Sequence, residues 1–379
     1  MLWLTKGLGP GGAERLLVTH AAVTDPGRIV YEAAYLLPHK THLVAELEAR
    51  GVATHVLDAP SALDPRWLAR FRRLVLEGDF DIVHAHSPAP AAQARVVVRS
   101  LPVADRPAFV YTEHNRWPSH ERLTRAANAA TFGLNDATIA VSSEVRDSVS
   151  ARYRRGMQVI VHGIDTSQGP VLAAERDATR AELGISADQF VVVTVANFRA
   201  SKGYPDLFEA ARLVTARNDR VRFLIVGQGP LDAELRGRLA ALDLGDRAQI
   251  LGYRSDAARI TAAADLFAMA SHHEGLPVAV MEAFAAGVPV VATDVGGLRE
   301  AVEPGVSGLL VAPRRPDRLA EAVLTVAGDP GRRAQLSAGA LAAAPRFSAE
   351  RSAREIEAVY DRALTSGALR AARRGRPRH

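Results

Sequence analysis

Short apolar runs alternate with longer helical patterns along almost the whole chain, and this alternation constrains the fold more than any other feature. A helix between consecutive strands brings those strands side by side and parallel, so the pattern predicts an α/β fold with open parallel sheets. The expected strands are residues 2–4, 29–36, 53–57, 82–84, 108–111, 137–141, 158–161, 190–195, 222–226, 248–251, 266–270, 288–292 and 308–311.

The stretch HGIDTSQGP interrupts the alternation and contains Gly163, Gly169 and Pro170. Because it has few apolar residues and two glycines, we expect a hinge between two Rossmann-like domains. The predicted domains are residues 1–165 and 166–366. The amphipathic pattern of FSAERSAREIEAVYDRAL predicts a long helix at the end of the second domain.

Composition excludes several classes of protein. The chain has no cysteine, so it has neither disulfides nor thiolate metal sites. No apolar run approaches the ~20 residues that span a bilayer, and we expect a cytoplasmic protein. The net charge is +5, but the segment 367–379 has five arginines and no acid, so the rest is near neutral. We expect this segment to be a disordered tail, and we expect no nucleic-acid partner.

Ligands of open parallel sheets bind beyond the carboxyl ends of the strands, so the loops that follow strands are the candidate sites. SHHEGLPVAVMEAFAAGVPVV follows the expected strand 266–270 and contains Glu274 and Glu282, with seven residues between them. Pro277 suits the first turn of a helix. The free N–H groups at the start of this helix can bind a phosphate; they belong to Gly275, Leu276 and Val278.

This segment suits a nucleotide-sugar. One carboxylate can bind the sugar, the helix N-terminus the diphosphate, and the second carboxylate the ribose hydroxyls. Glu282 falls among apolar helix residues, and a carboxylate buried without a partner is costly, which favours a binding role. The alternative is that Glu282 is an ordinary solvated side chain.

Three further loops follow strands. Arg199 and Lys202 lie directly after the strand 190–195, where cations can neutralise a leaving diphosphate; the alternative is an ordinary basic turn. Gly227, in the loop after the strand 222–226, can allow close approach of a ligand or form a plain turn. The same choice applies to two glycines that precede a later helix, Gly296 and Gly297.

The N-terminal stretch GLGPGG matches the pattern G-x-G-x-x-G, and Glu32 lies 20 residues beyond Gly12. These are marks of a dinucleotide-binding turn, so an NAD-dependent oxidoreductase is one alternative. That alternative leaves Glu274 and Glu282 without a role.

The segments GPGGAERLL, HAHSPAPA, TEHN, VSSEV and HGID, followed by EGLPVAVMEAFAAGVPVVATDVGGLREAV, together resemble the retaining glycosyltransferases of family 4. The resemblance covers nearly the whole chain, and its most specific part is the E-x7-E segment. It implies the GT-B architecture, in which two Rossmann-like domains face a cleft and a C-terminal helix crosses back to the first domain. It also implies sugar transfer from a nucleotide diphosphate to an acceptor hydroxyl, with the anomeric configuration retained.

The resemblance further assigns roles to residues. It implies that Glu274 contacts the donor sugar, Glu282 the ribose and Lys202 a phosphate. His114, in TEHN, would lie beside the reacting sugar. The family often has an arginine where this chain has Asn197, so we expect Arg199 to supply that charge. The first-domain glycines that would approach the donor phosphates are Gly11 and Gly12.

The resemblance implies no cofactor beyond the donor and no bound metal. Pairs such as His84 and His86 offer too few ligands for a metal site. We expect the acceptor to be a glycan, a glycolipid or a small glycoside. The basic segment RWLARFRRLVL can lie on an anionic membrane, or it can be a packed surface helix. A non-catalytic nucleotide-sugar-binding protein of the same fold is the remaining alternative.

Overall fold

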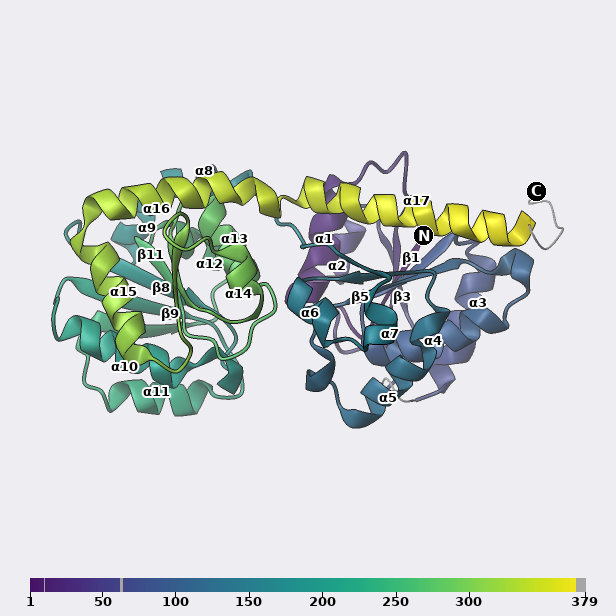
Figure 1. Ribbon diagram of the computed structural model, residues 1–379, viewed down its shortest axis with the longest axis horizontal. Coiled ribbons are helices and arrows are strands. Elements are labelled where there is room, and N and C mark those ends of the chain that lie inside the picture. Colours follow the sequence, from purple (N-terminus) through teal and green to yellow (C-terminus); the bar gives the residue numbers. More distant parts are fainter. Residues whose placement is uncertain (10, 62–63, 373–379) are drawn as a thin grey trace. The chain divides into compact units, whose positions relative to one another are not determined.

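The computed structural model describes residues 1–9, 11–61 and 64–372, and the chain forms two compact units (Figure 1). The first unit contains residues 1–163 and the C-terminal segment that begins at Ala349; the second contains residues 164–348. The expected domain boundary, after residue 165, lies two residues beyond the observed one, and the helix expected at the end of the second domain begins at Ala349. By its contacts, that helix belongs to the first unit.

The first unit is built on a seven-stranded parallel sheet with the order β3-β2-β1-β4-β5-β6-β7. From β1 the chain adds strands toward one side of the sheet, and from β4 it adds them toward the other side. Open α/β sheets bind ligands at such a switch point. The strands are β1 (Leu2–Thr5), β2 (Glu32–Tyr35), β3 (Ala53–Val56), β4 (Ile82–Ala85), β5 (Ala108–Glu113), β6 (Ala137–Ala140) and β7 (Met157–Val159).

Helices cover both faces of this sheet, and its central strands, β1 and β4, are therefore buried on both sides. One core contains Trp67 and Phe71 of α3, and the other contains Ile356 and Tyr360 of α17. The helices are α1 (Gly12–Val23), α2 (Val44–Glu48), α3 (Arg66–Glu77), α4 (Pro88–Ser100), α5 (Arg122–Thr131), α6 (Ser143–Ser148), α7 (Ala151–Arg154) and α17 (Ala349–Ala372).

The C-terminal helix α17 crosses onto the first unit, as we expected, and lies beside α1 there (Figure 1). Tyr360 packs with Trp3 of β1, and Glu357 pairs with Arg28 at 2.8 Å. The helix continues to Ala372, so residues 367–372 are helical and do not form the disordered tail that we expected. Their alanine, leucine and arginine residues are strong helix formers. Residues 373–379 of that predicted tail lie outside the described residues.

The second unit has a six-stranded parallel sheet with the order β10-β9-β8-β11-β12-β13, and its switch point lies between β8 and β11. The strands are β8 (Phe190–Val195), β9 (Val221–Val226), β10 (Ala248–Gly252), β11 (Leu266–Met269), β12 (Val290–Thr293) and β13 (Gly308–Val311). The helices are α8 (Gln168–Ala174), α9 (Arg176–Glu182), α10 (Tyr204–Thr215), α11 (Asp232–Ala240), α12 (Ala257–Ala262), α13 (Val278–Ala285), α14 (Gly296–Ala301), α15 (Pro316–Gly328) and α16 (Pro330–Ala343).

These two sheets confirm the predicted α/β class with two Rossmann-like units. The expected hinge stretch contains the boundary between the two units, at Gly163 and Ile164, but its last residues are helical, because α8 begins at Gln168 and includes Gly169 and Pro170. Gly169 is a packing residue: a Cβ there would lie 2.1 Å from the carbonyl oxygen of Ala285 on α13.

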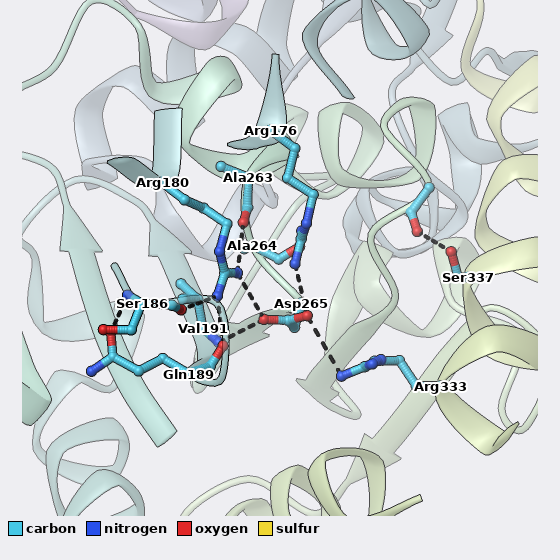
Figure 2. A network of polar contacts seen from close by, with 11 residues as sticks. Arg176, Arg180, Ser186, Gln189, Val191, Ala263, Ala264, Asp265, Arg333 and Ser337 are labelled. Atoms are coloured by element: carbon cyan, nitrogen blue, oxygen red, sulfur yellow. Dashed lines mark hydrogen bonds and ion pairs between the residues drawn. The ribbon is translucent and has the colours of Figure 1, made fainter. Parts of the chain in front are cut away.

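Charged side chains fasten α9 to the amino ends of the strands in the second unit (Figure 2). Asp265 accepts hydrogen bonds from Arg176 at 2.8 Å and from Arg180 at 3.1 Å, and it pairs with Arg333 at 3.5 Å. Its carboxylate also accepts the backbone N–H of Val191 at 2.8 Å. This network lies at the sheet edge opposite the loops that carry the candidate site.

The basic helix α3 has its apolar side in the protein core. Trp67, Phe71 and Val75 are buried, whereas Arg72 and Arg73 are exposed. The three buried residues belong to the hydrophobic core of the first unit. Among the described residues, no helix has the length and apolar character needed to cross a membrane.

Candidate functional site

Two loops meet at the switch point of the second sheet. Lys202 follows β8 and Glu274 follows β11, and Lys202 Nζ lies 2.5 Å from Glu274 Oε2. Ser271 Oγ donates a hydrogen bond to the same carboxylate oxygen at 3.0 Å. The two charged side chains are 18% and 10% exposed, so a ligand can reach them while little water surrounds them.

Close backbone packing holds these loops together. Gly203, directly after Lys202, has a φ of +64°, and a Cβ there would lie 2.0 Å from the carbonyl oxygen of Ala270. The backbone N–H of His272 donates to the carbonyl of Ser201 at 2.8 Å. The Lys202–Glu274 pair is therefore positioned by two strands and by contacts between the loops that follow them.

The E-x7-E segment adopts the local structure that we predicted. Pro277 precedes α13, and Glu282 is the fifth of its eight residues. Six of the eight residues of α13 are buried, and the other two, Val278 and Glu282, are half-buried. Gly275 and Leu276 lie in the turn before the helix, next to its free N–H groups.

Three predicted site glycines lie where the backbone conformation or close packing requires glycine. A Cβ at Gly297 would lie 2.0 Å from the carbonyl oxygen of Gly275, and Gly296 has a φ of +49° at the start of α14. A Cβ at Gly227 would lie 2.0 Å from the carbonyl oxygen of Ala196, in the loop after β8. Each of the three has a structural reason to be glycine.

Arg199 lies apart from this ion pair. Its side chain is exposed and forms no ion pair with any described residue, although its carbonyl accepts the N–H of Lys202 at 3.0 Å. The structure thus brings Lys202 and Glu274 together, whereas the side chain of Arg199 takes no part in this ion pair. This sheet edge offers the Lys202 cation and the Glu274 carboxylate close to the N-terminus of α13, which can bind an anion next to hydroxyl groups.

In the first unit, His114 lies beyond β5 within a histidine cluster that we define as His20, His84, His86, His114 and His162. His86 Nδ1 is 3.2 Å from His114 Nε2. The rings of His114 and His162 stack with centroids 5.1 Å apart. His84 lies against His86 and forms hydrogen bonds with Tyr360 at 2.8 Å and with Thr112 at 2.7 Å.

Burial keeps this cluster uncharged. It lowers the pKa of His162 to about 4 and that of His20 to about 3. The pKa values of His84, His86 and His114 are also lowered well below 6.5, first by burial and then by the neighbouring histidines. Near neutral pH these imidazoles therefore act as hydrogen-bond donors and acceptors.

A buried carboxylate anchors the loop that begins with His114. Glu113 is fully buried and accepts hydrogen bonds from Tyr111 at 2.9 Å, Trp117 at 3.0 Å and His120 at 3.1 Å. Our sequence reasoning singled out neither Glu113 nor His162. Glu113 belongs to TEHN and His162 to HGID. The family resemblance of these two segments is the only sign in the sequence that either residue lies near the site.

The glycine loop follows β1 at the carboxyl edge of the first sheet. Gly11 caps α1, and a Cβ at Gly12 would meet no atom within 4 Å. Glu32, in contrast, begins β2 at the opposite edge of the sheet and is bound to His55 at 2.5 Å. A ribose-binding acid of a dinucleotide site must lie at the carboxyl edge, so this geometry speaks against the NAD alternative.

None of the described residues forms a group of three or more histidines, aspartates or glutamates that could hold a metal ion. His84 uses both ring nitrogens for hydrogen bonds within the first unit. His272, in the second unit, is bound to Asp206 at 2.7 Å.

Two family models match the chain. The model for "Glycosyltransferase Family 4" matches residues 32–168, and that for "Glycosyl transferases group 1" matches residues 175–342. The D-inositol 3-phosphate glycosyltransferase 1 of Catenulispora acidiphila is 31% identical over 340 residues, which cover 83% of this chain and 78% of that protein. The D-inositol 3-phosphate glycosyltransferase of Frankia alni is 30% identical over 344 residues, covering 80% and 81%.

Solved structures share the fold. Anabaena HepE in complex with UDP has a TM-score of 0.82 at 24% identity, covering 95% of this chain and 99% of that one. Its complex with UDP-glucose has a TM-score of 0.81 at 25% identity, covering 95% and 98%. Because family models match both halves and a relative above 30% identity spans most of both chains, this chain belongs to the glycosyltransferases of the family 4 and group 1 type, with the GT-B architecture.

Proposed function

We propose that this glycosyltransferase takes a hexose from a nucleotide diphosphate donor and retains its anomeric configuration. The observation that carries the proposal is the Lys202–Glu274 pair beside the N-terminus of α13. In the proposed complex Lys202 binds the diphosphate, Glu274 a hydroxyl of the sugar and Glu282 the ribose. UDP-glucose is the first donor to test, because neighbouring structures hold UDP and UDP-glucose.

In the proposed reaction, the bond between the anomeric carbon and the diphosphate oxygen breaks. The acceptor oxygen bonds to that carbon on the same face, and its proton passes to the departing phosphate. Lys202 and the N–H groups of Gly275, Leu276 and Val278 stabilise the charge on the leaving group. These groups can supply that charge without a metal ion, so we expect transfer to continue in EDTA.

The first unit is proposed to bind the acceptor, with Gly11 and Gly12 near the donor phosphates and His114 beside the sugar. Two relatives act on D-inositol 3-phosphate according to their names, so polyols and their phosphates are the first acceptors to test. Glycans and lipid-linked glycans are the next class. Arg199, Gly227, Gly296 and Gly297 are proposed as further donor-site residues.

The proposal is tested by donor binding and turnover in matched variants. Glu282→Ala should weaken UDP binding by about 10- to 100-fold, the effect of losing hydrogen bonds from a charged group. Lys202→Ala should lower kcat by about 10²- to 10³-fold. Glu209→Ala is the control, because Glu209 is partly exposed on α10 and pairs with Arg212 of the same helix.

Three results would overturn parts of the proposal. Unchanged UDP affinity in Glu282→Ala would remove the ribose assignment. UDP binding without sugar release would indicate a non-catalytic binding protein. An NMR spectrum showing that the product has the opposite anomeric configuration to the donor would exclude retention.

A further inference from the structure

The contact between His86 and His114 requires one proton and one lone pair. Their facing nitrogens, His86 Nδ1 and His114 Nε2, lie 3.2 Å apart. Burial lowers the pKa of both rings well below 6.5, so both are neutral near pH 7. A neutral imidazole carries one N–H, and therefore either His86 donates from Nδ1 or His114 donates from Nε2.

The other nitrogen of His86 distinguishes these two arrangements. His86 Nε2 is buried and has no hydrogen-bond partner among the residues that the structure describes. If His114 were the donor, the proton of His86 would lie on this nitrogen as a buried N–H group without an acceptor. Buried N–H groups without an acceptor are rarer in folded proteins than buried acceptors without a donor. The proton of His86 is therefore expected on Nδ1.

We propose that His86 is a positioning residue that donates a hydrogen bond from Nδ1 to His114 Nε2 and fixes His114 as the Nδ1–H tautomer. An imidazole in water favours the Nε2–H tautomer, so the contact reverses the usual preference. His114 then presents an N–H group at Nδ1. This last step rests on the proposed function: the N–H group at Nδ1 of His114 donates a hydrogen bond to an oxygen of the bound sugar.

Neighbouring contacts hold both rings in place. His162 stacks on His114 with an angle of 9° between the ring planes, and the rings of His84 and His86 lie 4.1 Å apart. Both nitrogens of His84 are already bound to Tyr360 and Thr112, so His84 does not compete for either nitrogen of His86. The tautomer of His114 thus depends on the His86 proton.

The tautomer can be measured directly in the full chain. Histidine labelled with ¹⁵N gives two-bond ¹⁵N–¹H correlations that distinguish Nδ1–H from Nε2–H rings, and His114→Asn identifies the signals of His114. At pH 7.5 we expect His114 to have a protonated Nδ1 and an unprotonated Nε2. A protonated Nε2 in the wild-type protein would overturn the proposal.

Two substitutions test the role of His86. His86→Leu removes the donor, and we expect His114 to return to the Nε2–H tautomer, with kcat about tenfold lower and donor KM nearly unchanged. His86→Gln retains an N–H donor and should restore most of the activity and the Nδ1–H tautomer. His42→Leu is the control, because His42 is exposed in the same unit. His114 signals that do not change in a folded His86→Leu protein would contradict the positioning role.

The tautomer measurement does not depend on turnover, which separates this inference from the proposed function. An Nδ1–H tautomer in a chain that transfers no sugar would support the role of His86 while removing the catalytic role of His114. An Nε2–H tautomer in an active enzyme would overturn the role of His86 alone. If His86→Leu does not fold, the wild-type and His86→Gln spectra still decide the question.

Discussion

Glu113 shows how the first unit accommodates a charged group in its interior. Its carboxylate is fully buried and accepts hydrogen bonds from three side chains of its own segment, those of Tyr111, Trp117 and His120. Asn128 of α5 adds a longer contact at 3.4 Å. A buried carboxylate is stable only when its oxygens are hydrogen-bonded in this way. The same contacts fix the backbone that carries His114.

We predict that Glu113→Gln lowers the free energy of unfolding by about 1–3 kcal/mol, because the amide nitrogen cannot accept the hydrogen bonds made to one carboxylate oxygen. Urea unfolding measures this change. Glu121→Gln, at an exposed position a few residues later, is the control and should change stability by less than about 0.5 kcal/mol. Equal stability of the two variants would show that the carboxylate is not required.

At this scale, the sequence predicts which residues follow strands but not which side chains they contact. Lys202 and Glu274 were placed at one sheet edge because each follows an apolar run. That they form an ion pair depends on the loop geometry set by Gly203. The partners of Glu113 and the stacking of His162 on His114 depend on packing that no local pattern encodes.

The packing of α8 on α13 is a close contact that requires a glycine. We predict that Gly169→Ala lowers the free energy of unfolding by about 1–3 kcal/mol, because its Cβ would overlap the backbone of Ala285. Gly237→Ala on α11 is a matched control, since a Cβ there meets no atom within 4 Å. The control should stabilise the protein by about 0.5–1 kcal/mol, and urea unfolding compares the two. A stabilised Gly169→Ala protein would contradict the packing argument.

The strands of both sheets fall on the apolar runs where they were expected, for a physical reason. Parallel strands buried on both faces appear as continuous apolar runs, which are easy to recognise. Helix α4 was not predicted because its sequence begins with PAPAA; prolines at its first and third positions are tolerated where the N–H groups have no helical partner. The first turn of α8 was expected to belong to the hinge because Gly169 and Pro170 usually mark loops.

In the whole molecule, each unit places its candidate residues at the switch point of its own sheet. The second unit has Lys202 and Glu274 beyond β8 and β11; the first has the glycine loop and His86 beyond β1 and β4. This arrangement follows from the strand order of each sheet. The alternation of apolar and helical segments predicts that the strands are parallel but does not determine their order. The C-terminal helix joins the first unit through core contacts of Tyr360 and Ile356.

The histidine cluster makes the stability of the first unit depend on pH. Its members have lowered pKa values and stay neutral when folded, whereas the unfolded chain binds protons near pH 6.5. As the pH falls below 6.5, the unfolded state binds more protons and the free energy of unfolding decreases. Each histidine contributes up to about 1.4 kcal/mol per pH unit, until the pH reaches its folded-state pKa.

We predict that the first unit loses stability steeply between pH 6.5 and about 5, above the range in which carboxylates with ordinary pKa values titrate. Tryptophan fluorescence reports on this unit specifically, because the three tryptophans of the chain, Trp3, Trp67 and Trp117, all lie in it. Urea unfolding curves at several pH values measure the slope. His162→Asn should reduce it by about 1.4 kcal/mol per pH unit, whereas exposed His42→Asn should not. A free energy of unfolding that stays constant over this range would mean that the cluster is protonated in the folded protein.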